Sequence, residues 1–175
     1  MAITGKGMLC TRMDCPAEVD EEFNRWFNTE HMEERARIPG WEDCRRYVSL
    51  GHGQKYLNLY ETEALSALSS PAYKQRLANQ TDWSKKMMAQ FRNMERAVVT
   101  VTASAGVGHG GFIKFISFGN PQVLTDEFRG KLAGNVLPGL VADPLVLSAH
   151  LLEPDAVLSG PPPGSTGAPF EMKWY

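Results

Sequence analysis

The chain has 175 residues, of which 43% are hydrophobic and 22% charged, and its 18 basic and 20 acidic residues give a net charge of −2. This balance predicts a globular chain with an ordinary core, and it gives no reason to expect a nucleic acid or an anionic membrane as partner. No apolar run approaches the length of about 18 residues that a transmembrane helix needs, and the first ten residues lack the pattern of a signal peptide. The three cysteines form no CxxC pair, so we expect a reduced, cytoplasmic protein.

The first elements predicted are a short strand over residues 7–13 and a long amphipathic helix within Glu21–Trp41. Asp20 is the expected N-cap of that helix, and Pro39-Gly40 is expected to end it. Residues at helical spacing predict the buried stripe, which consists of Phe23, Phe27, His31 and Ile38, with Trp26 and Glu30 at its edge.

Residues 41–50 and 55–61 read as two strands joined by a turn at Gly51-His52-Gly53. The second strand alternates between aliphatic residues on one face and Tyr56, Asn58 and Tyr60 on the other. The aliphatic face suits packing under helices. The aromatic and polar face suits the lining of a cavity.

A helical piece at 64–68, a helix that follows Thr81 as N-cap, and a β-branched strand at 96–103 complete the first hundred residues. The resulting order is β-α-β-β-α-β. It predicts an α+β, ferredoxin-like fold, in which a four-stranded antiparallel sheet carries two helices on one face.

After a Gly-rich linker, residues 112–153 repeat features of the first part. A strand is expected at 112–118, Leu124–Phe128 resembles Val19–Phe23, and Leu137–Leu140 resembles Ile38–Trp41. We therefore predict a first ferredoxin-like repeat at 1–104 and a degenerate, incomplete second repeat at 105–175, with a shorter helix. The sheet of the second repeat would cover the first and enclose a cavity.

The stretches W-F-N-T-E-H at 26–31, I-P-G-W at 38–41, R-R-Y at 45–47 and K-Y-L-N-L-Y-E at 55–61 resemble the dimeric α/β-barrel superfamily. Within it the chain is most similar to EthD-like and uncharacterised proteins of bacterial catabolic clusters. The resemblance implies a sheet pair of the dimeric α/β-barrel type and a helix-borne His31 at the cavity mouth. Because members include cofactor-free monooxygenases, cyclases, isomerases and haem enzymes, it does not imply one reaction.

His31 is the candidate catalytic acid or base, because a neutral imidazole exchanges protons near pH 7. The alternative is a structural histidine that ties the helix to the sheet. One of Arg45 and Arg46 is expected to hold a substrate carboxylate while the other is solvated, and the strand register decides which. The remaining candidates for substrate contact are Tyr47, Tyr60, Trp26 and Asn58.

The four histidines show no metal-ligand spacing, so neither a metal nor any cofactor is expected, although a haem needs only one axial histidine. The expected function is a small enzyme (a lyase, isomerase or monooxygenase) that acts on an aromatic or ring-derived acid in a catabolic pathway. The alternatives are a non-catalytic small-molecule-binding accessory protein and a haem-binding protein. Open strand edges and apolar surface predict a homodimer.

Overall fold

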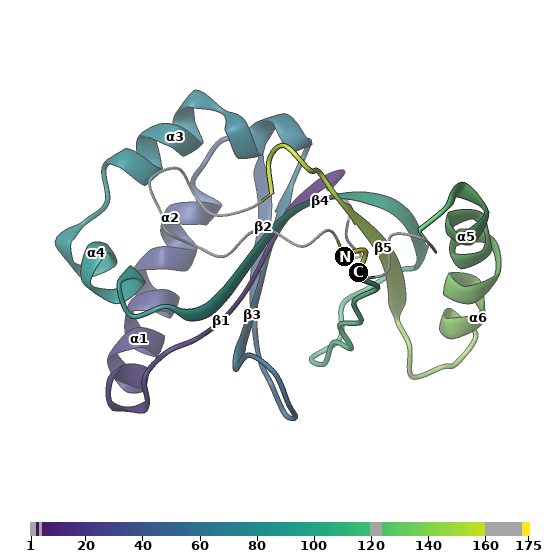
Figure 1. The fold of residues 1–175 in the computed structure, drawn as a ribbon, viewed down its shortest axis with the longest axis horizontal. Coiled ribbons are helices and arrows are strands. Elements are labelled where there is room, and N and C mark those ends of the chain that lie inside the picture. Colours follow the sequence, from purple (N-terminus) through teal and green to yellow (C-terminus); the bar gives the residue numbers. More distant parts are fainter. Residues whose placement is uncertain (1–2, 4, 120–123, 160–172) are drawn as a thin grey trace.

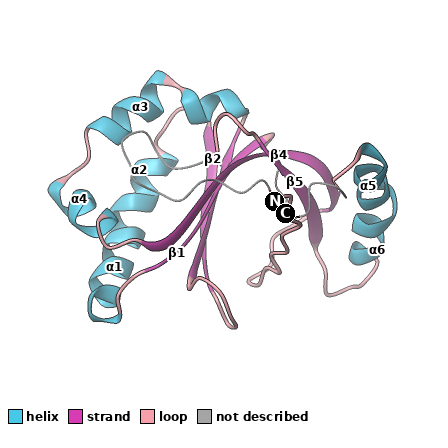
Figure 2. Cartoon of the chain, in the orientation of Figure 1, coloured by secondary structure: helices cyan, strands magenta, loops and turns pink. Residues whose placement is uncertain are grey.

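The computed structural model describes residue 3 and residues 5–119, 124–159 and 173–175. The first part contains β1(Gly7–Asp14), η1(Ala17–Val19), α1(Asp20–Trp26), η2(Phe27–His31), α2(Met32–Ala36), β2(Trp41–Val48), β3(Tyr56–Thr62), η3(Leu65–Ser69), α3(Pro71–Ala78), α4(Asp82–Met88) and β4(Arg92–Gly106). The second part contains α5(Asp126–Lys131), η4(Leu132–Val136), α6(Leu137–Val141) and β5(Ser148–Pro154). Figures 1 and 2 show their arrangement.

The described strands form one five-stranded sheet in the order β2-β3-β1-β4-β5, and all neighbouring strands are antiparallel. The first four strands, with their intervening helices, have the ferredoxin-like arrangement that the sequence predicts. The fold is therefore α+β. Helices α1–α4 lie on one side of this sheet, whereas α5 and α6 lie beside β5 (Figure 1).

One continuous helix crosses the sheet from Asp20 to Ala36, and a π-helical turn, η2, lies at its centre. The stripe predicted for this helix is buried, with Phe23 and Phe27 fully inaccessible. Asp20 is not the N-cap but the first helical residue. Its carboxylate instead accepts hydrogen bonds from the Tyr56 hydroxyl at 2.5 Å and from the Lys55 ammonium at 2.8 Å.

The faces of β3 are the reverse of the expected ones. Tyr56 packs in the aromatic core with Phe23 and Phe27, and Tyr60 packs beside Trp41, both beneath the helices. Leu59 lies on the other face of the sheet. The helix is itself rich in aromatic side chains, so the aromatic face of the strand finds its matching surface there and not in a cavity.

The connection between β3 and β4 contains one helix more than the sequence predicted. Ser70 accepts a hydrogen bond from the Tyr73 amide and so caps α3, where only a turn was expected. Thr81 caps α4 as predicted, with its hydroxyl 2.9 Å from the Ser84 amide.

The second part differs from its prediction in two places. Residues 112–118 do not form a strand, and only Phe118 forms a β-bridge, with Trp174. The helix at Asp126–Val141 is not short: its three segments of six, five and five residues nearly match the seven, five and five of the first helix. Pro138 does not end this helix but is the second residue of α6, directly after the π-helical turn η4.

Both helices contain a π-helical turn at their centre, and Tyr175 forms two backbone hydrogen bonds with Leu152 of β5. The division into repeats at 1–104 and 105–175 stays a prediction. Residues 160–172 of the second repeat lie outside the described residues.

Candidate functional site

The register of the β2–β3 hairpin separates the predicted site residues into two groups. Arg46 pairs with Asn58, and therefore shares the helix-facing side of the sheet. Arg45 pairs with Leu59, and so lies on the opposite face, as does Tyr47. The helix-facing side thus brings together five of the predicted residues, namely Trp26, His31, Arg46, Asn58 and Tyr60.

His31 ends the π-helical turn and lies in an aromatic layer between helix and sheet. Its ring centroid is 4.7 Å from those of both Trp26 and Phe27, and 5% of the residue is exposed. Among the described residues, no hydrogen-bond partner reaches the buried Nδ1 atom. Burial, and after it the positive charges of Arg35 and Arg46, hold the pKa of His31 well below its usual range. The imidazole is therefore neutral at pH 7.

Arg46 reaches from the edge strand β2 into the same layer. Its guanidinium lies 4.1 Å from the ring centre of Tyr56 and 4.4 Å from that of Phe27. Nη1 donates to the amide oxygen of Asn24 at 2.7 Å. Nε and Nη2 are buried without a partner, and within the described part of the chain no carboxylate lies at ion-pair distance from Arg46.

The other three residues of this group are Asn58, Trp26 and Tyr60. Asn58 is inaccessible to solvent; its amide nitrogen donates to Thr11 Oγ1 at 3.0 Å, while its oxygen has no partner among the described residues. Trp26 donates to Ser84 Oγ at 3.0 Å, which fixes the indole. Tyr60 is 2% exposed, and its ring meets that of His31 edge-on at 6.4 Å.

Arg45 is the centre of a separate cluster on the opposite face. Its Nη2 atom lies 2.6 Å from Asp43 Oδ2 and contacts the Glu61 carboxylate, and its Nη1 donates to His109 Nδ1. Burial opposes the charge of this guanidinium, but the hydrogen bond to Asp43 and the charges of Glu61 and Asp43 raise its pKa. Arg45 is thus neutralised within the chain.

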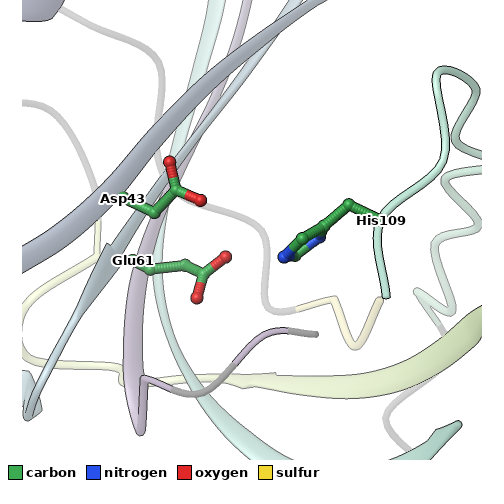
Figure 3. Close-up of side chains that lie close together, drawn as sticks. All are labelled: Asp43, Glu61 and His109. Carbon is green, nitrogen blue, oxygen red and sulfur yellow. The ribbon is translucent and has the colours of Figure 1, made fainter. Parts of the chain in front are cut away.

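The sequence did not reveal that Asp43, Glu61 and His109 come together. One potential metal-ligating atom from each lies within 4.8 Å of the others, and His109 points from the linker toward the two strand carboxylates (Figure 3). The pairing of Asp43 with Glu61 could have been found from the hairpin register, whereas no pattern places His109. The Arg45 guanidinium contacts all three side chains and supplies one positive charge beside the two carboxylates.

In the corresponding layer beneath α5 and α6, the arginine that the structure describes, Arg129, has its Nε and Nη2 atoms paired. Arg129 donates Nε and Nη2 to the two Glu153 oxygens at 2.6 and 2.7 Å, while its guanidinium lies 5.0 Å from the Trp174 ring. The Nε and Nη2 atoms, which lack a partner in Arg46, are therefore both paired in Arg129 with a carboxylate of the chain itself.

A cavity of about 410 Å³ opens between the end of α2 and α3. Its lining consists of Arg37, Ile38, Pro39, Ala72, Gln75, Arg76 and Asn79. It lies on the helix layer and touches neither His31 nor Arg46, so it does not by itself define the site.

No family model and no curated protein matches the chain. Solved structures that resemble it include a variant of SnoaB, a cofactor-independent oxygenase from Streptomyces nogalater (14% identity, TM-score 0.42), which matches over 57% of this chain and 95% of its own. The haem degrader MhuD from Mycobacterium tuberculosis, solved with two haems in its active site, matches with 14% identity and a TM-score of 0.43 over 58% and 99%. A hypothetical protein of Arabidopsis thaliana matches with 10% identity and a TM-score of 0.42 over 59% and 94%.

None of the helices in the described residues combines the length and the apolar character needed to cross a membrane.

Proposed function

We propose that this chain is a small enzyme that binds an aromatic or ring-derived acid between the α1–α2 helix and the β2–β3 hairpin. Arg46 holds the carboxylate of the ligand, and His31 acts as the acid or base. The observation that carries this proposal is that the Nε and Nη2 atoms of the half-buried Arg46 are themselves buried and have no partner among the described residues. These two nitrogens form the fork with which an arginine grips a carboxylate through two parallel hydrogen bonds.

The burial of Arg46 without a counter-charge supports an anionic ligand. Removal of a guanidinium from water costs free energy that only a paired anion and complete hydrogen bonding recover. Burial lowers the pKa of Arg46. The Asn24 amide and the faces of Phe27 and Tyr56 recover part of the cost, and a ligand carboxylate on the free edge would recover the rest.

His31 has the protonation state that a general base requires. The neutral ring presents an unpartnered nitrogen in the layer that Arg46 enters, and bound anion would make proton uptake by the ring easier. A π-helical turn at this position is a further feature that is frequent at functional sites. The ligand would reach the layer past Asn24 and Asn28, beside the edge strand β2.

The first test compares ring carboxylates with their neutral amides, for example benzoate and salicylate with benzamide and salicylamide. We expect the acids to raise the melting temperature of the wild-type protein and the amides to leave it unchanged. Arg46→Gln should lose the response to acids, whereas the control Arg92→Gln, at the exposed start of β4, should keep it. Equal responses of Arg46→Gln and the wild type would overturn the proposal.

Turnover distinguishes an enzyme from a binding protein of the same specificity. An acid that binds is incubated with the protein and followed by mass spectrometry, with and without oxygen, so that a lyase or isomerase is separated from a monooxygenase. The haem-binding alternative stays a prediction, which a titration with haemin tests through a shift of the Soret band.

We also propose that the chain forms a homodimer. Large apolar side chains project from the linker and from the loop before β5, where Val107, Phe112 and Leu145 are 83%, 84% and 88% exposed. Apolar surface of this kind favours association. Light scattering on a sizing column tests the proposal, and a monomer at micromolar concentration would contradict it.

A further inference from the structure

We infer that the ligand carries two anionic groups, one held by Arg46 and a second held by Arg35, on a frame that places His31 beside both. This inference deepens the proposed function and depends on it. The juxtaposition behind it is that of the buried Arg35 of α2 and the half-buried Arg46 of β2, both without an ion-pair partner among the described residues, around a single neutral histidine.

Arg35 is the more deeply buried of the two arginines. It is 4% exposed, although it is charged and lies on a helix. Its Nη1 atom has no hydrogen-bond partner among the described residues, and its guanidinium lies 5.9 Å from the Tyr73 ring. The neighbouring Glu34 does not compensate it, because that carboxylate pairs with Arg76 at 3.3 Å.

Arg35 and Arg46 act on the same side chains. Both positive charges lower the pKa of His31, after burial, which has the largest effect. Burial raises the pKa of Tyr60, and the charges of Arg35 and Arg46 both oppose that rise. The geometry places both guanidinium groups near His31: Arg35 follows His31 by four residues and so lies on the same face of the helix, while Arg46 lies 4.4 Å from the ring centre of Phe27, whose centroid is 4.7 Å from that of His31.

The two positive charges near His31 and Tyr60 then indicate the charge of the ligand. Elsewhere in the described residues the chain supplies carboxylates to five of its arginines, namely Arg12, Arg37, Arg45, Arg76 and Arg129, and the arginines that lack one, such as Arg25 and Arg92, are exposed. It supplies none to Arg35 and Arg46, although burial makes an unpaired charge more costly there. A monoanion would neutralise one of them, whereas a ring-derived dicarboxylate would neutralise both.

Calorimetric titration with benzoate and with the three benzenedicarboxylate isomers tests the inference on the wild-type protein. We expect at least one isomer to bind about tenfold more tightly than benzoate, which a second charge-assisted contact provides. Arg35→Gln should abolish this preference, Arg35→Lys should retain part of it, and Arg92→Gln should retain all of it. Circular dichroism verifies that each variant is folded.

A second measurement does not depend on the variants. Titration of the imidazole resonances by NMR should show that a dicarboxylate raises the pKa of His31 more than benzoate does, because it screens both positive charges.

The outcomes separate the two proposals. Equal affinities for benzoate and all three isomers, or an undiminished preference in folded Arg35→Gln, would overturn the inference and leave the role of Arg46 intact. Unchanged benzoate binding in Arg46→Gln would overturn the proposed function. Absence of binding of all four acids to the wild type would overturn both.

Discussion

Arg45 and Arg46 are consecutive on β2, yet the first is bridged to Asp43 and Glu61 on one face of the sheet while the second lies against Phe27 and Tyr56 on the other. Alternation along the strand places them on opposite faces, and the chain provides carboxylates on only one of these. One arginine is thus part of the protein's own charge network, and the other is available to a ligand.

This difference predicts unequal effects on stability. Arg45→Met removes the cation that contacts two carboxylates, one of them on Glu61 with a side chain only 4% exposed. We expect it to lower the free energy of unfolding by about 3 kcal/mol, because buried charge is left uncompensated. Arg46→Met removes an unpaired charge and should change stability by no more than about 1 kcal/mol. Urea unfolding measures both, and equal losses would contradict the assignment.

Stability should fall as the pH is lowered below about 6.5, the pKa of an unfolded histidine. Burial lowers the pKa of His31, His109 and His150 in the folded state. Between the folded and unfolded values the unfolded chain binds more protons, so the free energy of unfolding decreases on acidification, by at most about 1.4 kcal/mol per pH unit for each proton.

The variant His31→Gln should show a flatter pH dependence of that free energy between pH 7 and pH 5 than the wild type. His52→Gln, which changes an exposed residue of the β2–β3 turn, serves as control and should keep the wild-type dependence. Urea unfolding at several pH values is the measurement. A wild-type slope in His31→Gln would mean that His31 is protonated equally in both states.

For a substrate that is turned over, His31→Gln should reduce kcat by about a hundredfold or more, the usual contribution of a general acid or base. Because the pKa of His31 lies well below its usual range, kcat/KM of the wild type should stay constant from pH 8 down through pH 6.5 and fall only at lower pH. A fall centred at or above pH 7, or full activity of the variant, would exclude His31 as the base.

The three cysteines should be unreactive in the folded protein. Burial raises the pKa of Cys10, Cys15 and Cys44, each to about 12, and only the thiolate attacks a disulfide reagent. At pH 8 we expect slow reaction with Ellman's reagent in buffer and rapid reaction of all three thiols in urea. Rapid modification of a thiol in buffer would show that its segment opens.

Local patterns were sufficient to predict most of the first hundred residues. The apolar periodicity of the first helix and the capping hydroxyl of Thr81 specify their elements through contacts near in sequence. The β-branched run at 96–103 predicts β4 through its composition, although the strand pairs with the distant β1. The segment 112–118 has a strand-like composition, but a strand also needs a partner, and composition does not supply one.

The candidate site could be predicted only in part, because its residues were found and their surroundings were not. His31, Arg46 and Asn58 do lie together, but beneath the helices. The alternating pattern of β3 allows either face to be covered by helices, and the aromatic side chains of the first helix determine which face is covered. Arg35 was missed because an arginine near the end of an amphipathic helix ordinarily belongs to the solvated face. Its burial depends on the π-helical turn that precedes it.

That turn acts as a phase shift within the helix. Each residue of an α-helix advances the direction of the side chains by about 100°, so the one additional residue of a π-helical turn rotates everything after it relative to everything before it. Conversion of η2(Phe27–His31) to a regular α-helical turn without loss of a residue would turn the α2 side chains by about 100° relative to those of α1 and take Arg35 away from the layer that Arg46 enters. Loss of a single codon within η2 would instead remove the additional residue together with the π-helical turn, so that α2 keeps its present face toward the sheet.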